Sequence, residues 1–108
     1  MNLISVIIPT KNRNDLLNKA VSSVLRQTYD NWELLIINDY GNEIKLDYED
    51  MRINIKKNQY CKGGNGARNT GITLSKGDFI AFLDDDDEWK KEKLKKQLNV
   101  MKNSNAIL

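Results

Sequence analysis

The sequence predicts an α/β domain with a mainly parallel sheet and flanking helices, and three observations indicate this fold class. Short apolar runs alternate along the chain with segments whose apolar residues recur at helical spacing. The longest runs are apolar almost without interruption, as expected for strands that are covered on both faces. Polar clusters follow the runs at 9–13, 38–39 and 84–87, and ligands of such sheets bind at the carboxyl ends of the strands.

The first part of the chain supplies two expected strands with a helix between them. Residues 3–8 form the first apolar run, and Pro9 is expected to stop its hydrogen-bond ladder. A helix follows, and either Asn12 or Asn14 can cap it. Residues 32–37 form the second buried strand. The helix is expected to be amphipathic because its apolar residues form one stripe: Leu16, Leu17, Ala20, Val21, Val24 and Leu25.

The remainder is expected to add two strands and two helices. Residues 52–56 alternate between polar and apolar, which is typical of an edge strand. A polar loop with glycines at 58–66 precedes a short helix at 67–75, and an apolar strand follows at 79–83. Residues 106–108 favour the start of a further strand. The architecture is therefore Rossmann-like, and its last helix is marked by Leu94, Leu98 and Met101.

Length and composition restrict the class of protein. A chain of 108 residues points to one small domain, and a net charge of +2 is too small to argue for nucleic-acid binding. The absence of histidine removes Ser-His-Asp and Cys-His catalysis. A single cysteine, Cys61, rules out an internal disulfide and fits a reducing compartment. No apolar run approaches the ~20 residues of a membrane span, and the start lacks a basic signal-peptide region, so we expect a cytoplasmic protein.

Four consecutive aspartates, residues 84–87, directly follow the apolar run at 79–83, and a helix is expected to begin right after them. Carboxylates a few ångströms apart repel by roughly 1 kcal/mol per pair in water. A divalent cation would offset this repulsion, since Mg²⁺ binds one or two carboxylates together with phosphate oxygens of a ligand. The alternative is helix capping with Asp87 as N-cap, which accounts for one or two of the acids but not for four.

Four blocks of sequence carry a resemblance to a known family. They are ISVIIPTKNR at 4–13, SVLRQTY at 23–29 followed by Trp32-Glu33, GARNTGI at 66–72, and KGDFIAFLDDDDEW at 76–89. In this order they resemble the family 2 glycosyltransferases of the GT-A fold, over roughly residues 3–102. Each block alone is a modest signal, but four blocks in the right order make a chance similarity improbable.

The resemblance implies roles for individual residues. Its D-x-D motif falls on 84–86, so that Asp86 would ligate Mn²⁺ or Mg²⁺, and Asp84 would reach the metal through water or hold the ribose. Asp39 would meet the uracil or ribose of a nucleotide-sugar, and Arg68 the base or the diphosphate. The other positions that the resemblance implies for donor binding are Pro9, Thr10, Asn12, Arg13 and Asp85.

The resemblance also implies an activity. Residues 1–108 would be the nucleotide-sugar-binding portion of a GT-A domain that is incomplete at its C-terminus. The enzyme would transfer a sugar with inversion from a nucleotide-diphospho-sugar, a UDP-sugar being favoured, to a glycan or lipid-linked acceptor in bacterial polysaccharide biosynthesis, peripheral to the inner face of the membrane. The catalytic base of the family lies in the second half of the fold. No catalytic residue is therefore expected in this chain, which should transfer little or no sugar alone.

Two other readings stay open. One is a truncated, non-catalytic nucleotide-binding or self-associating module, which would form a homodimer through the face that the second half of the fold would cover. The other is a metal-dependent phosphotransferase-like domain, which fits less well because the first strand ends in Pro-Thr-Lys rather than in acids. The lysines of the last helix are most simply a solvated helix face.

Overall fold

The structure is a computed structural model that describes residues 2–104. Its single sheet has four strands in the order β3-β2-β1-β4, and all pairings are parallel. The strands are β1 (Ile4–Thr10), β2 (Trp32–Asn38), β3 (Ile53–Lys57) and β4 (Phe79–Phe82). The helices are α1 (Asn14–Leu25), α2 (Gly64–Leu74) and α3 (Lys93–Ser104). The predicted α/β class with a parallel sheet is confirmed, whereas the strand expected at 106–108 lies outside the described residues.

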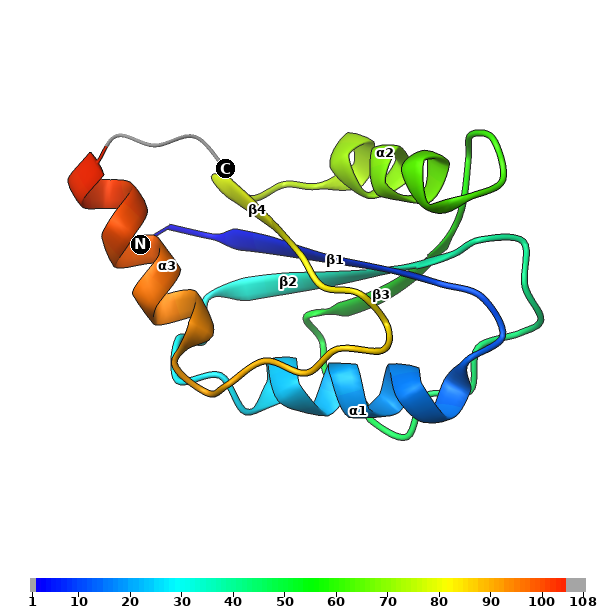
Figure 1. Ribbon diagram of the computed structural model, residues 1–108, viewed down its shortest axis with the longest axis horizontal. Helices are drawn as coiled ribbons and strands as arrows, with labels where there is room; N and C mark the ends of the chain where they lie inside the picture. Colours follow the sequence, from blue (N-terminus) through cyan, green and yellow to red (C-terminus); the bar gives the residue numbers. More distant parts are fainter. Residues whose placement is uncertain (1, 105–108) are drawn as a thin grey trace.

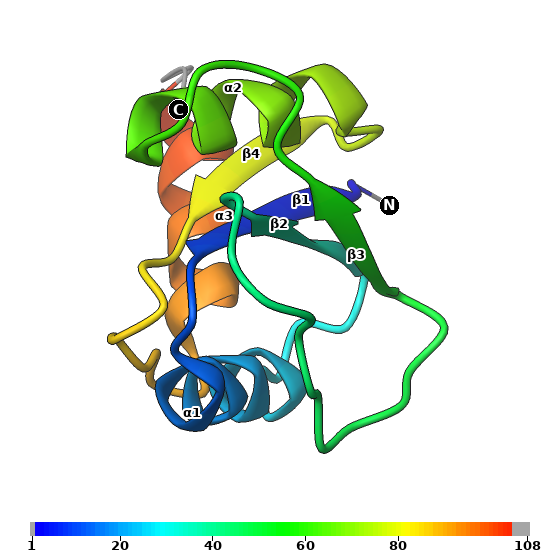
Figure 2. The same ribbon diagram turned by 90° about the vertical axis from the view of Figure 1, so that its right-hand side faces the viewer.

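Helices cover both faces of the sheet (Figures 1 and 2). On one face, α1 and α3 pack against side chains such as Val6 and Ile8, and on the other face α2 packs against Ile7. Successive residues of β1 thus enter different cores, because side chains alternate across a strand. This arrangement explains why the sequences of β1, β2 and β4 are nearly continuous apolar runs. Among residues 2–104, no helix combines the length and the apolar character needed to cross a bilayer.

The strand order reverses at β1, which has β2 on one side and β4 on the other. In open parallel sheets this reversal opens a crevice at the carboxyl ends of the strands, since the flanking connections leave in opposite directions. The expected edge strand is confirmed: within residues 2–104, β3 pairs only with β2, and its outer end carries Lys56 and Lys57. Charged side chains of this kind discourage pairing with a further strand.

The expectation that Pro9 stops the first strand was wrong. Strand β1 continues through Pro9 to Thr10, and both residues stay in register with β2. The main-chain oxygen of Ile7 accepts a hydrogen bond from Leu83, on the β4 side, and that of Thr10 accepts one from Asp39, on the β2 side. The nitrogen of Pro9 therefore faces the β4 side, where pairing with β4 has already ended at Ile7, so no ladder hydrogen bond is lost.

The expected asparagine cap of α1 was also wrong. The N-cap residue is Arg13, and no side chain caps the helix. Both asparagine side chains instead bind the segment that follows β2. Oδ1 of Asn12 accepts a hydrogen bond from the N–H of Asn42 at 2.7 Å, and Oδ1 of Asn14 accepts one from the N–H of Lys45 at 3.3 Å. The apolar stripe is otherwise buried or half-buried as predicted, except that Leu16 is 41% exposed.

No helix begins directly after the four aspartates, contrary to expectation. Helix α3 starts at Lys93, so the alternative role of Asp87 as its N-cap was wrong. The buried amide of Gln27, just after α1, fixes the start instead. Its Nε2 donates to the main-chain oxygen of Lys90 at 2.8 Å, and its Oε1 accepts the N–H of Leu94 at 3.0 Å. The intervening residues turn back at 85–86 and then run alongside α1 to the start of α3, visible in yellow and orange in Figure 1.

Candidate functional site

A cleft of about 440 Å³ lies at the carboxyl ends of β1, β2 and β4. It is at the strand-order reversal, where ligands of such sheets bind. Of the nine residues with predicted site roles, only Asn12 does not line it. The lining residues are Pro9, Thr10, Lys11, Arg13, Asp39, Gly64, Arg68, Asp84, Asp85 and Asp86.

Asp39 forms part of the inner wall of the cleft. It follows β2, is 9% exposed, and accepts a hydrogen bond from Nδ2 of Asn58 at 2.9 Å. The N–H of Gly63 lies 3.0 Å from each of its carboxylate oxygens. Gly63 has a φ of 122°, a conformation that only glycine adopts readily. The sequence therefore places a glycine where the main chain must turn its N–H toward this acid.

The second helix starts earlier than predicted, directly after the anchored Gly63. Helix α2 begins at Gly64, three residues before the expected position, so residues 64–66 are helical rather than a flexible loop. The packing around Gly66 requires the absence of a side chain, because a Cβ there would lie 1.9 Å from the main-chain oxygen of Cys61. The glycines thus serve a close-packed helix start that carries Arg68 to the cleft.

Asp85 is the other inner acid. It is 7% exposed, and its carboxylate accepts hydrogen bonds from Oγ1 of Thr10 at 2.8 Å and from Nη1 of Arg13 at 3.3 Å. These contacts join the end of β1 to the turn after β4. Since Asp85 is directed inward, the run of four aspartates divides into one buried member and three exposed members.

The three exposed members, Asp84, Asp86 and Asp87, each present one carboxylate oxygen, and these oxygens all lie within 4.8 Å of one another. We call this group the outer acids. Oxygen-only donors at this spacing suit a hard divalent cation such as Mg²⁺ or Mn²⁺. Asp84 and Asp86 were the predicted metal ligands. Asp87 was not named as a ligand and had a role only in the alternative of helix capping, although its place in the same run was already a signal.

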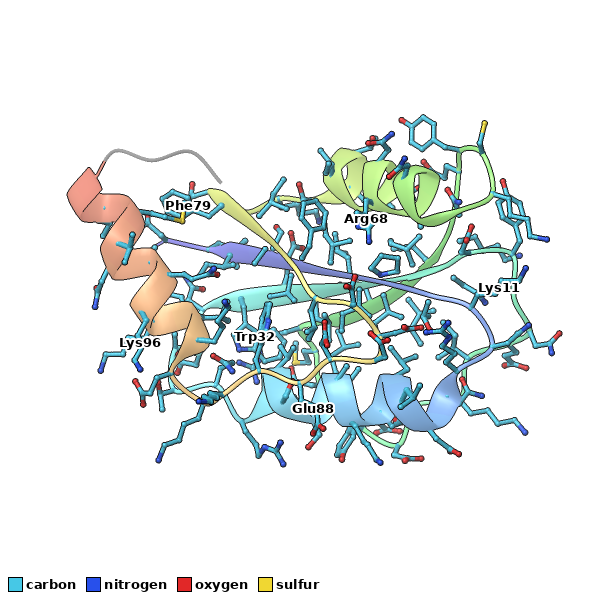
Figure 3. The ribbon with its side chains drawn as sticks, in the orientation of Figure 1. Lys11, Trp32, Arg68, Phe79, Glu88 and Lys96 are labelled. Carbon is cyan, nitrogen blue, oxygen red and sulfur yellow. The ribbon has the colours of Figure 1, made fainter. Side chains whose placement is uncertain are left out.

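Two arginines lie beside the outer acids. Nη2 of Arg68 is 3.3 Å from Asp84, and Nη1 of Arg13 is 3.9 Å from Asp86. Figure 3 shows Arg68 reaching from α2 toward the sheet. The mouth of the cleft thus combines carboxylates that can hold a cation with guanidinium groups that can hold phosphate oxygens.

Two lining residues were not predicted as site residues. Lys11 is exposed at the rim, where its side-chain hydrogen bond with Lys62 lowers its pKa; desolvation lowers it further, and the charge of Asp39 opposes the shift. Gly64 lies beneath Arg68, and a Cβ at this position would meet Nη1 of that arginine at 3.0 Å. Lys11 sits in the first block of the resemblance, which was the available signal, whereas nothing in the sequence singles out Gly64.

The fold is that of the N-terminal part of a GT-A domain. The crystal structure of S. aureus TarS 1-349 in complex with UDP superposes with a TM-score of 0.79 at 22% identity, covering 94% of this chain and 32% of that chain. The mannosyltransferase PcManGT from Pyrobaculum calidifontis, in complex with GDP-Man and Mn²⁺, gives a TM-score of 0.78 at 18% identity, with 91% and 32% covered.

The sequence matches the model of glycosyl transferase family 2 over residues 5–108, and the chain belongs to that family. The resemblance seen in the four blocks is thereby confirmed. A relative from Escherichia coli, the UDP-Glc:alpha-D-GlcNAc-diphosphoundecaprenol beta-1,3-glucosyltransferase WfgD, is 43% identical over 107 residues. That alignment covers 95% of this chain but 42% of the relative, so the chain spans less than half the length of this glycosyltransferase.

Proposed function

We propose that this chain is the donor-binding part of an inverting glycosyltransferase. It binds a nucleotide-diphospho-sugar, preferably a UDP-sugar, with Mn²⁺ or Mg²⁺, and the whole enzyme transfers the sugar to a glycan or lipid-linked acceptor in the cytoplasm, peripheral to the membrane. The observation that carries this proposal is the set of exposed acids, Asp84, Asp86 and Asp87, beside two arginines at the mouth of one cleft.

The donor set fits the proposed cation. All three outer acids are exposed and offer only oxygen ligands, and Mg²⁺ and Mn²⁺ prefer carboxylate and phosphate oxygens to nitrogen or sulfur. Asp86 and Asp84 would hold the ion. When bound, such an ion stabilises the negative charge that grows on a diphosphate leaving group.

The remaining residues of the cleft suit the donor nucleotide. Arg13 and Arg68 carry planar guanidinium groups, which bind phosphate oxygens in a bidentate manner. In the structure they pair with the acids themselves, and a bound diphosphate would replace these partners. Pro9 and Thr10 form a wall of the cleft, and Asp39 is proposed to meet the base or ribose. Donor binding would thus replace the exposed ion pairs that Arg13 and Arg68 make with the acids by ion pairs with phosphate oxygens.

Asn12 and Asp85 were also expected to contact the donor. Asn12 lies outside the cleft lining, and its Oδ1 accepts the N–H of Asn42. Asp85 lines the cleft, yet its carboxylate is engaged by Thr10 and Arg13. We propose that Asp85 positions Arg13 and the outer acids, and that Asn12 shapes the loop beside them.

The related proteins support the choice of donor and acceptor. The name of WfgD states a UDP-Glc donor and a diphosphoundecaprenol-linked acceptor. The solved TarS complex contains UDP, and the PcManGT complex contains GDP-Man and Mn²⁺. A UDP-sugar, a divalent cation and a lipid-linked acceptor are therefore the first ligands to test.

The test is a thermal-shift series with UDP, GDP and ADP, each with and without Mn²⁺. A ligand present at about 100 times its dissociation constant adds about 2.7 kcal/mol to the stability of the folded state. UDP is expected to raise the melting temperature in the presence of Mn²⁺ and to have little effect without it. In Asp86→Ala the Mn²⁺-dependent shift should disappear.

A matched control removes one negative charge elsewhere. Glu49 is exposed and does not line the cleft, so Glu49→Ala should keep the full shift with UDP and Mn²⁺. If Asp86→Ala retained the same shift as Glu49→Ala, Asp86 would not be a ligand. The 108-residue chain should bind the donor and transfer little or no sugar, because the family's catalytic base is expected outside it. Clear turnover by this chain would contradict that assignment.

A second candidate function is a self-associating module, and one observation favours it. A groove of about 330 Å³ beside the edge of β4 is lined mainly by apolar residues, of which Ile72 and Phe82 are 44% and 45% exposed. A second copy of the chain is the proposed occupant, since among residues 2–104 no strand other than β1 pairs with β4. Analytical ultracentrifugation at micromolar concentration decides the matter: a dimer that Phe82→Ser dissociates supports this function, and a strict monomer rejects it.

A further inference from the structure

The positive charge of the chain is concentrated at its last helix. Residues 88–104 contain six lysines and two glutamates, a net charge of +4, whereas the whole chain carries +2. The other residues together therefore carry −2. Among the described residues, none of these lysines takes part in an ion pair. Their charge is thus available to an external anionic partner.

Helix α3 has a buried apolar side and exposed sides that carry lysines. Leu94, Leu98 and Met101 are buried against the rest of the molecule. Helical periodicity places Lys95 and Lys102, which are seven residues apart, along one flank of this buried stripe. Lys96 lies on the side opposite the stripe, and Figure 3 shows it pointing away from the sheet. One side of α3 is therefore anchored, and the other presents ammonium groups to solvent.

The lysine side extends beyond the helix. Lys90 and Lys91 are exposed just before its start, where Gln27 fixes the main chain through the oxygen of Lys90. We define the basic face as the five exposed lysines of this region: Lys90, Lys91, Lys95, Lys96 and Lys102. None of them lines the cleft that holds the outer acids, so the basic face is separate from the proposed donor site.

An exposed apolar side chain lies beside the basic face. Val100 is 63% exposed and follows Lys96 by one helical turn, and together with Lys93 and Met101 these residues line a shallow groove of about 380 Å³. Lysine stems cover apolar surface while their charged ends stay in water. A helix with lysines around an exposed apolar residue suits the boundary between headgroups and acyl chains. A nucleic-acid backbone would use the lysines but would offer no environment for the valine.

We propose that the basic face binds the surface of a bilayer that carries anionic lipid headgroups. Its use for bringing the cleft to a lipid-linked acceptor rests on the proposed function, whereas the lipid binding itself does not. A lysine near an anionic membrane contributes about fivefold in partitioning, the equivalent of about 1 kcal/mol. Loss of three lysines should therefore weaken binding by at least about tenfold and up to on the order of 100-fold.

Co-sedimentation of the 108-residue chain with vesicles tests the proposal. Vesicles of phosphatidylcholine with phosphatidylglycerol should bind the chain, with an affinity that falls as salt is raised, and vesicles of phosphatidylcholine alone should not. The triple variant Lys95→Gln/Lys96→Gln/Lys102→Gln should lose at least about tenfold in partitioning. Val100→Ser should weaken binding to a smaller extent, because it removes only the apolar contact.

The matched control is Lys19→Gln/Lys45→Gln/Lys76→Gln, which removes the same charge from exposed lysines outside α3. It should lose much less than the first triple variant. Equal losses in the two variants, equal binding to uncharged vesicles, or displacement from vesicles by a short RNA duplex at lower concentration than by anionic lipid would each overturn the proposal. The shift with UDP and Mn²⁺ should be unchanged in both variants, so a failure here is distinguishable from a failure of the proposed function.

Discussion

The inner and outer acids of the cleft differ in almost every physical respect. Asp39 and Asp85, the inner acids, are 9% and 7% exposed, and each accepts hydrogen bonds from two neighbours. The outer acids Asp84, Asp86 and Asp87 are exposed and crowd one another. Asp85 lies between two outer acids in the sequence, so adjacent residues of identical type have opposite environments.

The comparison shows that a single run of acids can contain one residue that stabilises the structure of the site and others that are available to bind its ligand. A buried carboxylate that accepts several hydrogen bonds contributes to stability, and its loss leaves the donors without a partner. Exposed carboxylates held close together contribute little or oppose folding slightly. The inner acids should therefore matter for stability, and the outer acids for ligand binding.

The largest expected effect is that of Asp39→Ala. It would leave Nδ2 of Asn58 and the N–H of Gly63 without their acceptor, and we expect a loss of about 3 kcal/mol in the free energy of unfolding, measured by urea denaturation. Asp39→Asn keeps one acceptor oxygen and should lose less. A loss in Asp39→Ala no greater than in Glu49→Ala would show that this acid does not hold the loop.

Asp85→Ala is expected to destabilise the fold by about 2 kcal/mol, because it removes the acceptor of Thr10 and one partner of Arg13. Thr10→Val is nearly isosteric and should cost about 1 kcal/mol. Urea unfolding of the two single variants and of the double variant forms a cycle. The double variant should be more stable than additivity predicts, and strict additivity would contradict a direct interaction.

Asp50, which does not line the cleft, forms a partly exposed ion pair with Arg52, and this pair allows the contribution of such a contact to stability to be measured. The hydrogen bonds from Arg52 lower the pKa of Asp50 from 3.8 to about 2, and the same guanidinium lies 3.7 Å from the ring centre of Trp32. Because this pKa is lowered on folding, the pair stabilises the fold above pH 3.8, and the contribution is lost as the pH falls toward about 2.

We expect this contribution to be about 1 kcal/mol, since solvent screens a partly exposed pair. Urea unfolding at neutral pH and near pH 2 should show that Asp50→Asn lowers stability at neutral pH and makes little difference in acid. An equal effect of the substitution at both pH values would mean that the carboxylate charge does not contribute.

The smallest expected effect on stability is that of Asp87→Ala, at less than about 0.5 kcal/mol, because the change removes an exposed charge from a repulsive group. The same variant should weaken the Mn²⁺-dependent shift with UDP if Asp87 supports the ion. Calorimetry with Mn²⁺ alone offers a second readout. A loss of stability comparable to that of Asp85→Ala would abolish the distinction between inner and outer acids.

Much of the fold could be predicted because its core is regular. Apolar runs predicted β1, β2 and β4, an alternating pattern predicted β3, and the stripe that contains Leu17 and Val24 predicted α1. The errors lie where tertiary contacts override local preference. Pro9 is tolerated because β4 pairs only as far as Ile7, and Asn12 caps no helix because Asn42 uses its oxygen. Neither contact is visible in the local sequence.

The site was predictable as a set of residues but less so as an arrangement. Eight of the nine positions with predicted roles line one cleft, because the blocks of the resemblance end the strands that meet there. The division of the run 84–87 depends on Thr10 and Arg13, which are more than seventy positions away in the sequence. No pattern within four identical residues could indicate which member faces inward.

The attachment of Gln27 to Lys90 and Leu94 gives the segment after the acids a fixed span. One end is tied to the sheet through Asp85 and the other to the end of α1. For the stability of the fold, a substitution of the exposed Glu88 would be tolerated far more readily than a change in the number of residues in this span, because one inserted residue would force either tie to break. Across related glycosyltransferases, the length of this segment should therefore vary less than the identity of the residue at the position of Glu88.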